Sequence, residues 1–440
     1  MCGGVGSLEF EIPEPSIDRI SMTPVLISSN GSDRATGYNM SSKLIRTSDT
    51  LFAGWLDAPS ASGDTAKVQF AAFDPQTGDH RSTQILGEGI DNHCGPALAM
   101  DPDGRMHALI GAHHGPLLYR WSDGPAEAGS WSAPEPLGPD DTYPSLAIDT
   151  EGTLHLAHRE KADRWQLWYR RKRRNQEWES PVSIAISPTP GYNHYMMSLT
   201  VGPTGTLHLV FQFHFAESGR AEDCKCRAAV YLRSYDSGDT WLDDGDEIAH
   251  LPVTMESMTP IRYVPDGGDD QHAVRVANNV VDGQDRAWFF ASIQDAEHGI
   301  VFRRDPGGWK EFDLSRMTGG LNVEGGRASS ITRSADGRIH LALATNPQGL
   351  RTKWYDPSLS LFHTSFNEEG EDHRIKAVTV PDSEAANWLP ALEHWDWNRT
   401  NICCQDGHWM MYTRGLNAGG IGGDNKSPLK TEVYLTKVSP

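Results

Sequence analysis

One pattern recurs along the chain and limits its possible folds more than any other feature: an apolar strand, a turn rich in Asp and Gly, and a second apolar strand. Alternating apolar residues on either side of such a turn predict a β-hairpin. Six copies are clear and a seventh is degenerate. The copies are Ser42–Leu56, Ala97–Gly111, Ser145–Arg159, Ser198–Gln212, Asn279–Ala291, Ser330–Ala344 and Asn401–Gly415.

A third strand follows several hairpins, and it ends in an aromatic and a basic residue. The examples are Leu117–Arg120, Leu167–Arg170, Val230–Arg233 and Ile300–Arg303. After the third of these, Ser234–Trp241 (SYDSGDTW) matches the Asp-box pattern and resembles the turn between the third and fourth strands of sialidase-type propeller blades.

Seven such repeats predict an all-β, seven-bladed β-propeller with four-stranded antiparallel blades, formed by a single domain over residues 1–440. We expect the C-terminal strand Glu432–Lys437 to close the ring beside an N-terminal segment. A β-sandwich, or two smaller β domains, is the alternative, and seven similar hairpins disfavour it.

Charge and hydrophobicity exclude several classes of partner. The formal net charge is −20, which argues against nucleic acid because neutralising phosphates requires a basic face. An anionic sugar polymer stays open, since a local basic cleft can act on an acidic body. No run of 18 apolar residues occurs, so we expect no membrane insertion. No signal peptide is evident at the start, and we expect a monomer that is secreted, periplasmic or at the cell surface.

The loops at the two ends of each hairpin should open on one face of a propeller. In the second copy, His93 precedes the first strand and His113 follows the second. In the third copy, Tyr143 precedes the first strand and Arg159 ends the second. Because the two copies are neighbours, we predict that these four side chains meet near the central channel.

This set of side chains suits β-elimination on a uronate. The weakly acidic proton at C5 lies beside a carboxylate, whose charge an Arg or a protonated His must first offset. A Tyr or His can then act as base, and one of them can protonate the departing O4. We therefore interpret His93, His113, Tyr143 and Arg159 as catalytic candidates, and the flanking side chains as substrate-binding candidates. The latter are Asn92, His114, Tyr192 and Tyr195.

Two stretches resemble the β-propeller ulvan lyases and the related rhamnose–glucuronate lyases. The first is Asp91–Arg120, with its N-H-x-x-P-A-L lead-in and G-A-H segment, and the second is Tyr143–Arg159. The resemblance implies His93 and His113 as active-site histidines, Tyr143 as general base and acid, and Arg159 as the group that neutralises the uronate. It implies a cut at a rhamnose–uronate linkage that leaves a 4,5-unsaturated uronate.

A metal site is predicted one blade later, and no organic cofactor. His194 and His214 flank the fourth hairpin, and Cys224 and Cys226 follow in the next loop. Two imidazoles and two thiolates suit a closed tetrahedral Zn²⁺ site, whose role would be structural because no position is left for water. His272 is the competing ligand to His194.

Two other functions remain open on the same fold. The first is a sialidase-like or rhamnosidase-like glycoside hydrolase, and the second is a non-catalytic carbohydrate-binding propeller. A typical hydrolase needs two facing carboxylates, whereas the nearest acid here is Asp91. This difference favours elimination.

Overall fold

The chain is described by a computed structural model, in which nearly all regular structure is β-strand. The described residues are 20, 22–60, 64–113, 115–125, 129–161, 163–187, 190–193, 195–216, 218–220, 225–265, 274–293, 299–318, 329–346, 356–382, 384–399, 407–415 and 431–439. Four of the predicted site residues lie outside this set: His114, His194, Cys224 and His272.

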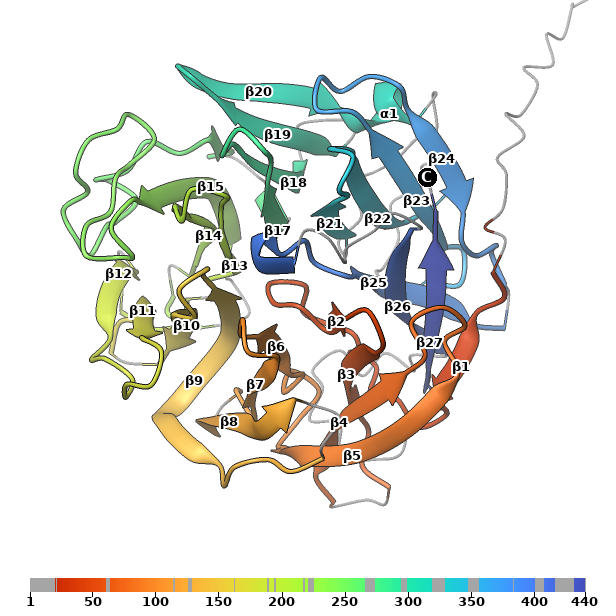
Figure 1. Cartoon of the computed structure of the whole chain (residues 1–440). Helices are drawn as coiled ribbons and strands as arrows, with labels where there is room; N and C mark the ends of the chain where they lie inside the picture. The colour runs from red at the N-terminus through yellow and green to blue at the C-terminus, as the bar shows by residue number, and fades with distance from the viewer. Residues whose placement is uncertain are drawn as a thin grey trace, which may run out of the picture.

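The strands form antiparallel sheets that are arranged around a common centre (Figure 1). Four sheets contain four consecutive strands each. These are β2 (Leu44–Arg46), β3 (Leu51–Asp57), β4 (Ala66–Phe73) and β5 (His80–Gly89); β13 (Met197–Val201), β14 (Leu207–Phe215), β15 (Lys225–Ser234) and β16 (Arg262–Tyr263); β17 (Val274–Val281), β18 (Ala287–Ile293), β19 (Ile300–Asp305) and β20 (Gly308–Asp313); and β21 (Ser329–Arg333), β22 (Ile339–Thr345), β23 (Ser360–Phe366) and β24 (Arg374–Ala377).

A seven-stranded sheet combines two repeats through one long strand. Its order is β12 (Val182–Ile186), β11 (Gln166–Lys172), β10 (Leu154–Glu160), β9 (Glu135–Ile148), β8 (Gly115–Pro125), β7 (Arg105–Ile110) and β6 (Ala97–Met100). The first half of β9 pairs with β8 and its second half pairs with β10. The long strand therefore ends one repeat and begins the next.

The sixth sheet joins the two ends of the described chain. Its order is β1 (Val25–Ser28), β27 (Thr431–Val438), β26 (His408–Gly415) and β25 (Ala386–Leu392). The expected closure is confirmed, because β27 pairs with β1. The prediction for the seventh hairpin is wrong in its first strand: β26 pairs with β25, and residues 401–406 lie outside the described residues.

Inner strands of neighbouring sheets contact one another around the centre, from β2 and β6 through β9, β13, β17 and β21 to β25. Apolar side chains fill the spaces between sheets; Leu167, Leu209 and Trp241, for example, share one buried cluster. Among the described residues, the helical elements are α1 (Leu314–Met317) and the 3₁₀ turn η3 (Trp397–Arg399). No helix among the described residues has the length and apolar character to cross a membrane.

Two buried histidines, His340 and His363, should make the protein sensitive to acid. His340 lies 3.0 Å from His363 (Nδ1 to Nε2), and its ring centroid is 4.3 Å from that of His408. Burial, with Lys376 nearby, lowers the pKa of His363 to about 3, and burial lowers that of His340 well below its ordinary value. Both are therefore neutral in the folded state, whereas the unfolded chain binds protons below about pH 6.5.

We expect the free energy of unfolding to fall as the pH drops from about 6.5 to 5, by up to about 1.4 kcal/mol per pH unit for each such histidine. Thermal unfolding across this range would measure the slope. His363→Asn should flatten it, while the same change at the exposed His80 should leave it intact. An unchanged slope in His363→Asn would show that other groups cause the acid sensitivity.

Candidate active site

Four predicted catalytic side chains, from two neighbouring repeats, lie in one cluster. His93 lies in the loop before β6 and His113 follows β7, and their rings stack with centroids 4.1 Å apart. The ring of Tyr143, from β9, lies 6.0 Å from that of His113. The guanidinium carbon of Arg159, from β10, lies 4.7 Å from the Tyr143 ring centroid. The convergence expected from the hairpin ends is therefore present, and the catalytic roles stay predictions.

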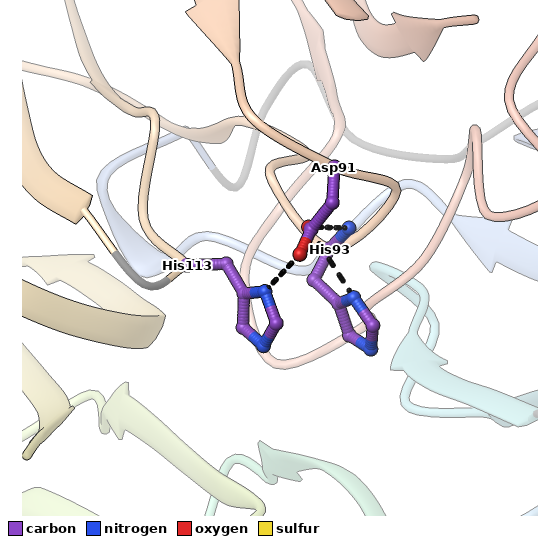
Figure 2. Close-up of side chains that lie close together, drawn as sticks. All are labelled: Asp91, His93 and His113. Atoms are coloured by element: carbon purple, nitrogen blue, oxygen red, sulfur yellow. Dashed lines mark hydrogen bonds and ion pairs between the residues drawn. The ribbon is translucent and has the colours of Figure 1, made fainter. Parts of the chain in front are cut away.

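Asp91 joins the two histidines, as Figure 2 shows. One carboxylate oxygen, Oδ2, contacts Nδ1 of His113, and the other, Oδ1, lies 3.3 Å from Nδ1 of His93. Oδ1 also accepts a 2.8 Å hydrogen bond from the backbone N–H of His93. Burial alone would raise the pKa of Asp91, but the hydrogen bonds from His113 and His93 outweigh it and hold that pKa far below its usual value. Asp91 is therefore a carboxylate that orients both rings.

Tyr143 has an unusual backbone that re-aims its side chain. Its φ is +54°, in the left-handed region that non-glycine residues rarely occupy, and the β9–β10 register shifts at this point. Strain of this kind recurs at functional sites, where the surrounding structure holds it. The side chain is 5% exposed, and burial raises the pKa of its phenol well above 10, with Tyr38 and Tyr192 adding to the effect. Tyr143 is therefore protonated at neutral pH.

Arg159 is held in place from several sides but keeps one donor unused. Its Nε donates to Thr142 Oγ1 at 2.6 Å, and its Nη1 donates to the Asn193 carbonyl at 3.0 Å. Its guanidinium carbon lies 4.2 to 5.4 Å from the centroids of three aromatic rings, those of Tyr143, Trp165 and Tyr192. Nη2 has no hydrogen-bond partner among the described residues. This side chain is fully buried, and the half-buried Tyr192 lies against it.

Two of the predicted substrate-binding residues have structural contacts instead. Tyr195 is fully buried, and its hydroxyl donates to the Trp165 carbonyl at 3.1 Å. Asn92 is 1% exposed and donates to Asp33 Oδ1 at 2.7 Å, which ties two loops together. Neither side chain faces solvent, and direct sugar contact by Asn92 and Tyr195 stays a prediction. Tyr192 fits its predicted place better, since its hydroxyl lies 3.4 Å from Arg159 Nη1.

A family model described as "BNR repeat-containing family member" matches residues 52–317, more than half of the chain. The chain belongs to the BNR repeat-containing family. No curated protein matches it in sequence.

Solved structures of two polysaccharide lyases are similar to this BNR repeat-containing protein. An ulvan lyase of family PL25, with -[GlcA(1-4)Rha3S]- bound, has a TM-score of 0.68 at 14% identity over 95% of this chain and 96% of that one. The polysaccharide lyase Uly1 has a TM-score of 0.59 at 11% identity over 94% of this chain and 93% of that one. The resemblance to β-propeller ulvan lyases is thus confirmed, and at these identities it establishes the fold alone.

Sequence reasoning missed two residues of the cluster, Arg34 and Tyr38, in the loop before β2. Nη1 of Arg34 contacts both the Tyr38 hydroxyl and Nε2 of His93. The Tyr38 ring lies 5.1 Å from that of Tyr143. Their signal in the sequence was positional only: like His93, they precede the inner strand of a sheet.

The Asp91–His93–His113 group has potential ligand atoms within 4.8 Å of one another, a spacing that a metal ion could use. However, the Arg34 guanidinium contacts His93 Nε2, and a cation in the group would be repelled by it. Both Nδ1 atoms already face Asp91. We interpret the group as a hydrogen-bonded network.

Part of the predicted zinc site lies within the described residues. His214 and Cys226 are cross-strand partners in β14 and β15, next to a register shift. Cys226 is buried, and its thiol contacts the Val274 carbonyl. The backbone pairing thus brings these two predicted ligands together along the sequence of the two strands, and the zinc site stays a prediction.

Proposed function

We propose that this protein is a polysaccharide lyase that cuts an acidic rhamnose–uronate glycan, similar to ulvan, by β-elimination on a seven-bladed propeller. The observation that carries the proposal is a cluster in which two imidazoles share one carboxylate, and a phenol and a guanidinium lie beside them. A typical hydrolase would need two facing carboxylates. The likeness to a PL25 ulvan lyase with -[GlcA(1-4)Rha3S]- bound supports the substrate class.

Arg159 would bind the uronate carboxylate. Its guanidinium is always charged, and Nη2 is the donor that the described protein residues leave unused. Neutralising the carboxylate lets negative charge move onto it as the C5 proton leaves. Tyr192 would give way to the substrate, because its half-buried ring and hydroxyl lie against the guanidinium.

His113 and Tyr143 would divide the proton transfers. The C5–H bond breaks and its proton goes to Nε2 of His113, whose other nitrogen is held by Asp91. The electron pair forms the C4=C5 double bond, the C4–O4 bond breaks, and O4 takes the phenol proton of Tyr143. A proton passing from His113 to Tyr143 restores both groups. Because its pKa is raised, the Tyr143 phenol carries the proton that a general acid donates, whereas the sequence resemblance gives it both roles.

Ultraviolet absorbance during digestion tests the function. The protein would be incubated with ulvan and with other uronic-acid polysaccharides. A lyase produces an unsaturated uronate that absorbs in the ultraviolet, and its products together have the mass of the substrate. A hydrolase gives no absorbance and adds one water per cut. Binding without cleavage would favour the carbohydrate-binding alternative.

A structural Zn²⁺ held by His214, Cys226, Cys224 and either His194 or His272 is also part of the proposal. The ion would fix the connection between β14 and β15, beside the site. We expect about one zinc per chain by elemental analysis, as one closed four-ligand site requires. Cys226→Ser should lose it and lower the unfolding temperature, while Cys94→Ser should keep it. Metal-free wild-type protein with the same unfolding temperature would contradict the zinc site.

The glycan polymer would be met outside the cell, so a secreted, periplasmic or cell-surface location belongs to the same proposal. A monomeric state and a single domain over residues 1–440 belong to it as well.

A further inference from the structure

Arg34 reaches the active-site cluster from a loop that is fixed on two sides. Its neighbour Asp33 accepts hydrogen bonds from Asn92 Nδ2 at 2.7 Å and, through its carbonyl, from Trp388 Nε1 at 2.6 Å. The loop is thus bound both to the loop before β6 and to β25. Arg34 Nη1 is thereby placed against Nε2 of His93.

This contact determines where the His93 proton sits. A guanidinium can only donate hydrogen bonds, so Nε2 of His93 must accept and cannot carry a proton. The proton of the neutral ring is then on Nδ1, which lies 3.3 Å from Asp91 Oδ1. His113 is held in the same tautomer, because its Nδ1–H donates to Asp91 Oδ2, and Nε2 is therefore the nitrogen that would take up a proton.

We propose that Arg34 is a positioning residue that holds His93 as the neutral Nδ1–H tautomer, so that His113 is the imidazole that takes up the proton. This inference rests on the proposed function for its catalytic meaning. It also assigns His93 a role other than base, since the lone pair of Nε2 is occupied by Arg34.

The charges around His93 agree with this assignment. Arg34 and Tyr38 face it from the loop before β2, Asp91 and His113 from its own sheet, and Tyr143 from β9. Burial and then the Arg34 charge lower the pKa of His93 well below 6.5, while Asp91 acts in the opposite direction. Two charged imidazoles with centroids 4.1 Å apart would repel each other, so at most one ring of the pair becomes positively charged, and the Asp91 contact favours His113 as that ring.

The first test needs no substrate. Nitrogen-15 NMR of the histidine rings, assigned with His93→Asn and His113→Asn, would report tautomer and titration. We expect His93 to stay neutral with Nδ1–H from pH 5 to 8. In Arg34→Met, which keeps the bulk but has no donor, we expect His93 to titrate at a higher pH. Arg34→Lys should keep it neutral, as should Arg316→Met, a control at an exposed position.

The second test uses the lyase reaction. Arg34→Met should lower kcat by about 100-fold with little change in KM, and should move the acid limb of the pH profile upward. Arg34→Lys should restore most of the activity and the pH profile. A wild-type His93 that carries its proton on Nε2, or an Arg34→Met protein with unchanged tautomer and pH profile, would overturn the inference. Absence of lyase activity in the wild type would instead refute the proposed function, while the NMR result would still decide the tautomer.

Discussion

Replacing Tyr143 with Phe is expected to lower kcat on a uronate glycan by about 10³-fold, the typical contribution of a general acid. The change removes one oxygen and keeps the ring that packs against Tyr38 and Arg159. Without the phenol, the departing O4 has no proton donor at this position and the C4–O4 bond breaks slowly. KM should change little, because the phenol acts on the transition state. Initial rates from ultraviolet absorbance would measure the loss.

Tyr231→Phe is the matched control for this prediction. Tyr231 is also a buried phenol, and its hydroxyl lies 2.8 Å from Nδ1 of His208, outside the cluster. It should keep wild-type kcat, and both variants should unfold near the wild-type temperature. Losing a general acid usually lowers the rate by at least about 100-fold. If Tyr143→Phe kept more than about a tenth of the wild-type activity, the assigned role would therefore be wrong.

The hairpins were predictable because each one depends on local chemistry. In the second copy, Asp101 Oδ1 accepts from the backbone N–H groups of Asp103 and Arg105, and Gly104 adopts a φ of +81°. A D-P-D-G turn between apolar strands encodes this geometry within a few residues. The strand register within each hairpin follows from the alternation of apolar and polar residues along its strands.

The seventh repeat shows where local patterns fail. Its inner strand, β25, is separated from β26 by residues 393–407, which include η3. A search for two strands joined by a tight turn therefore selected the wrong first strand. When a long connection separates two strands, a short stretch of sequence does not show which strand pairs with which.

The cluster itself was predictable from topology, but its connections were not. His93, His113, Tyr143 and Arg159 were found because hairpin ends converge. The convergence of hairpin ends does not predict side-chain direction. Tyr195 was therefore a substrate-binding candidate, although its side chain is fully buried. Arg34 was missed because its contact to His93 depends on how two loops from different sheets pack.

Arg159→Ala is expected to lower kcat/KM on a uronate glycan by about 10³-fold, since it removes the positive charge that stabilises the developing enolate. The activity of Arg159→Lys should lie between those of Arg159→Ala and the wild type, because lysine keeps the charge but lacks the planar fork that binds a carboxylate. Ultraviolet assays on each variant would measure the loss. Because Arg159 is buried against three rings, loss of packing could by itself reduce activity, so the charge must be tested separately.

A methyl-esterified glycan separates the two effects. Its C5 proton lies beside a neutral ester, which needs no cation to offset a charge. If Arg159 acts by neutralising the carboxylate, Arg159→Ala should lose far less activity on the ester than on the acid. The ratio of the rate on the ester to the rate on the acid should therefore be much higher in Arg159→Ala than in the wild type, by a large part of the roughly 10³-fold effect expected for a lost stabilising donor. Equal losses on both substrates would mean that Arg159 only supports Tyr143 and Tyr192, and the carboxylate-binding role would have to pass to another cation.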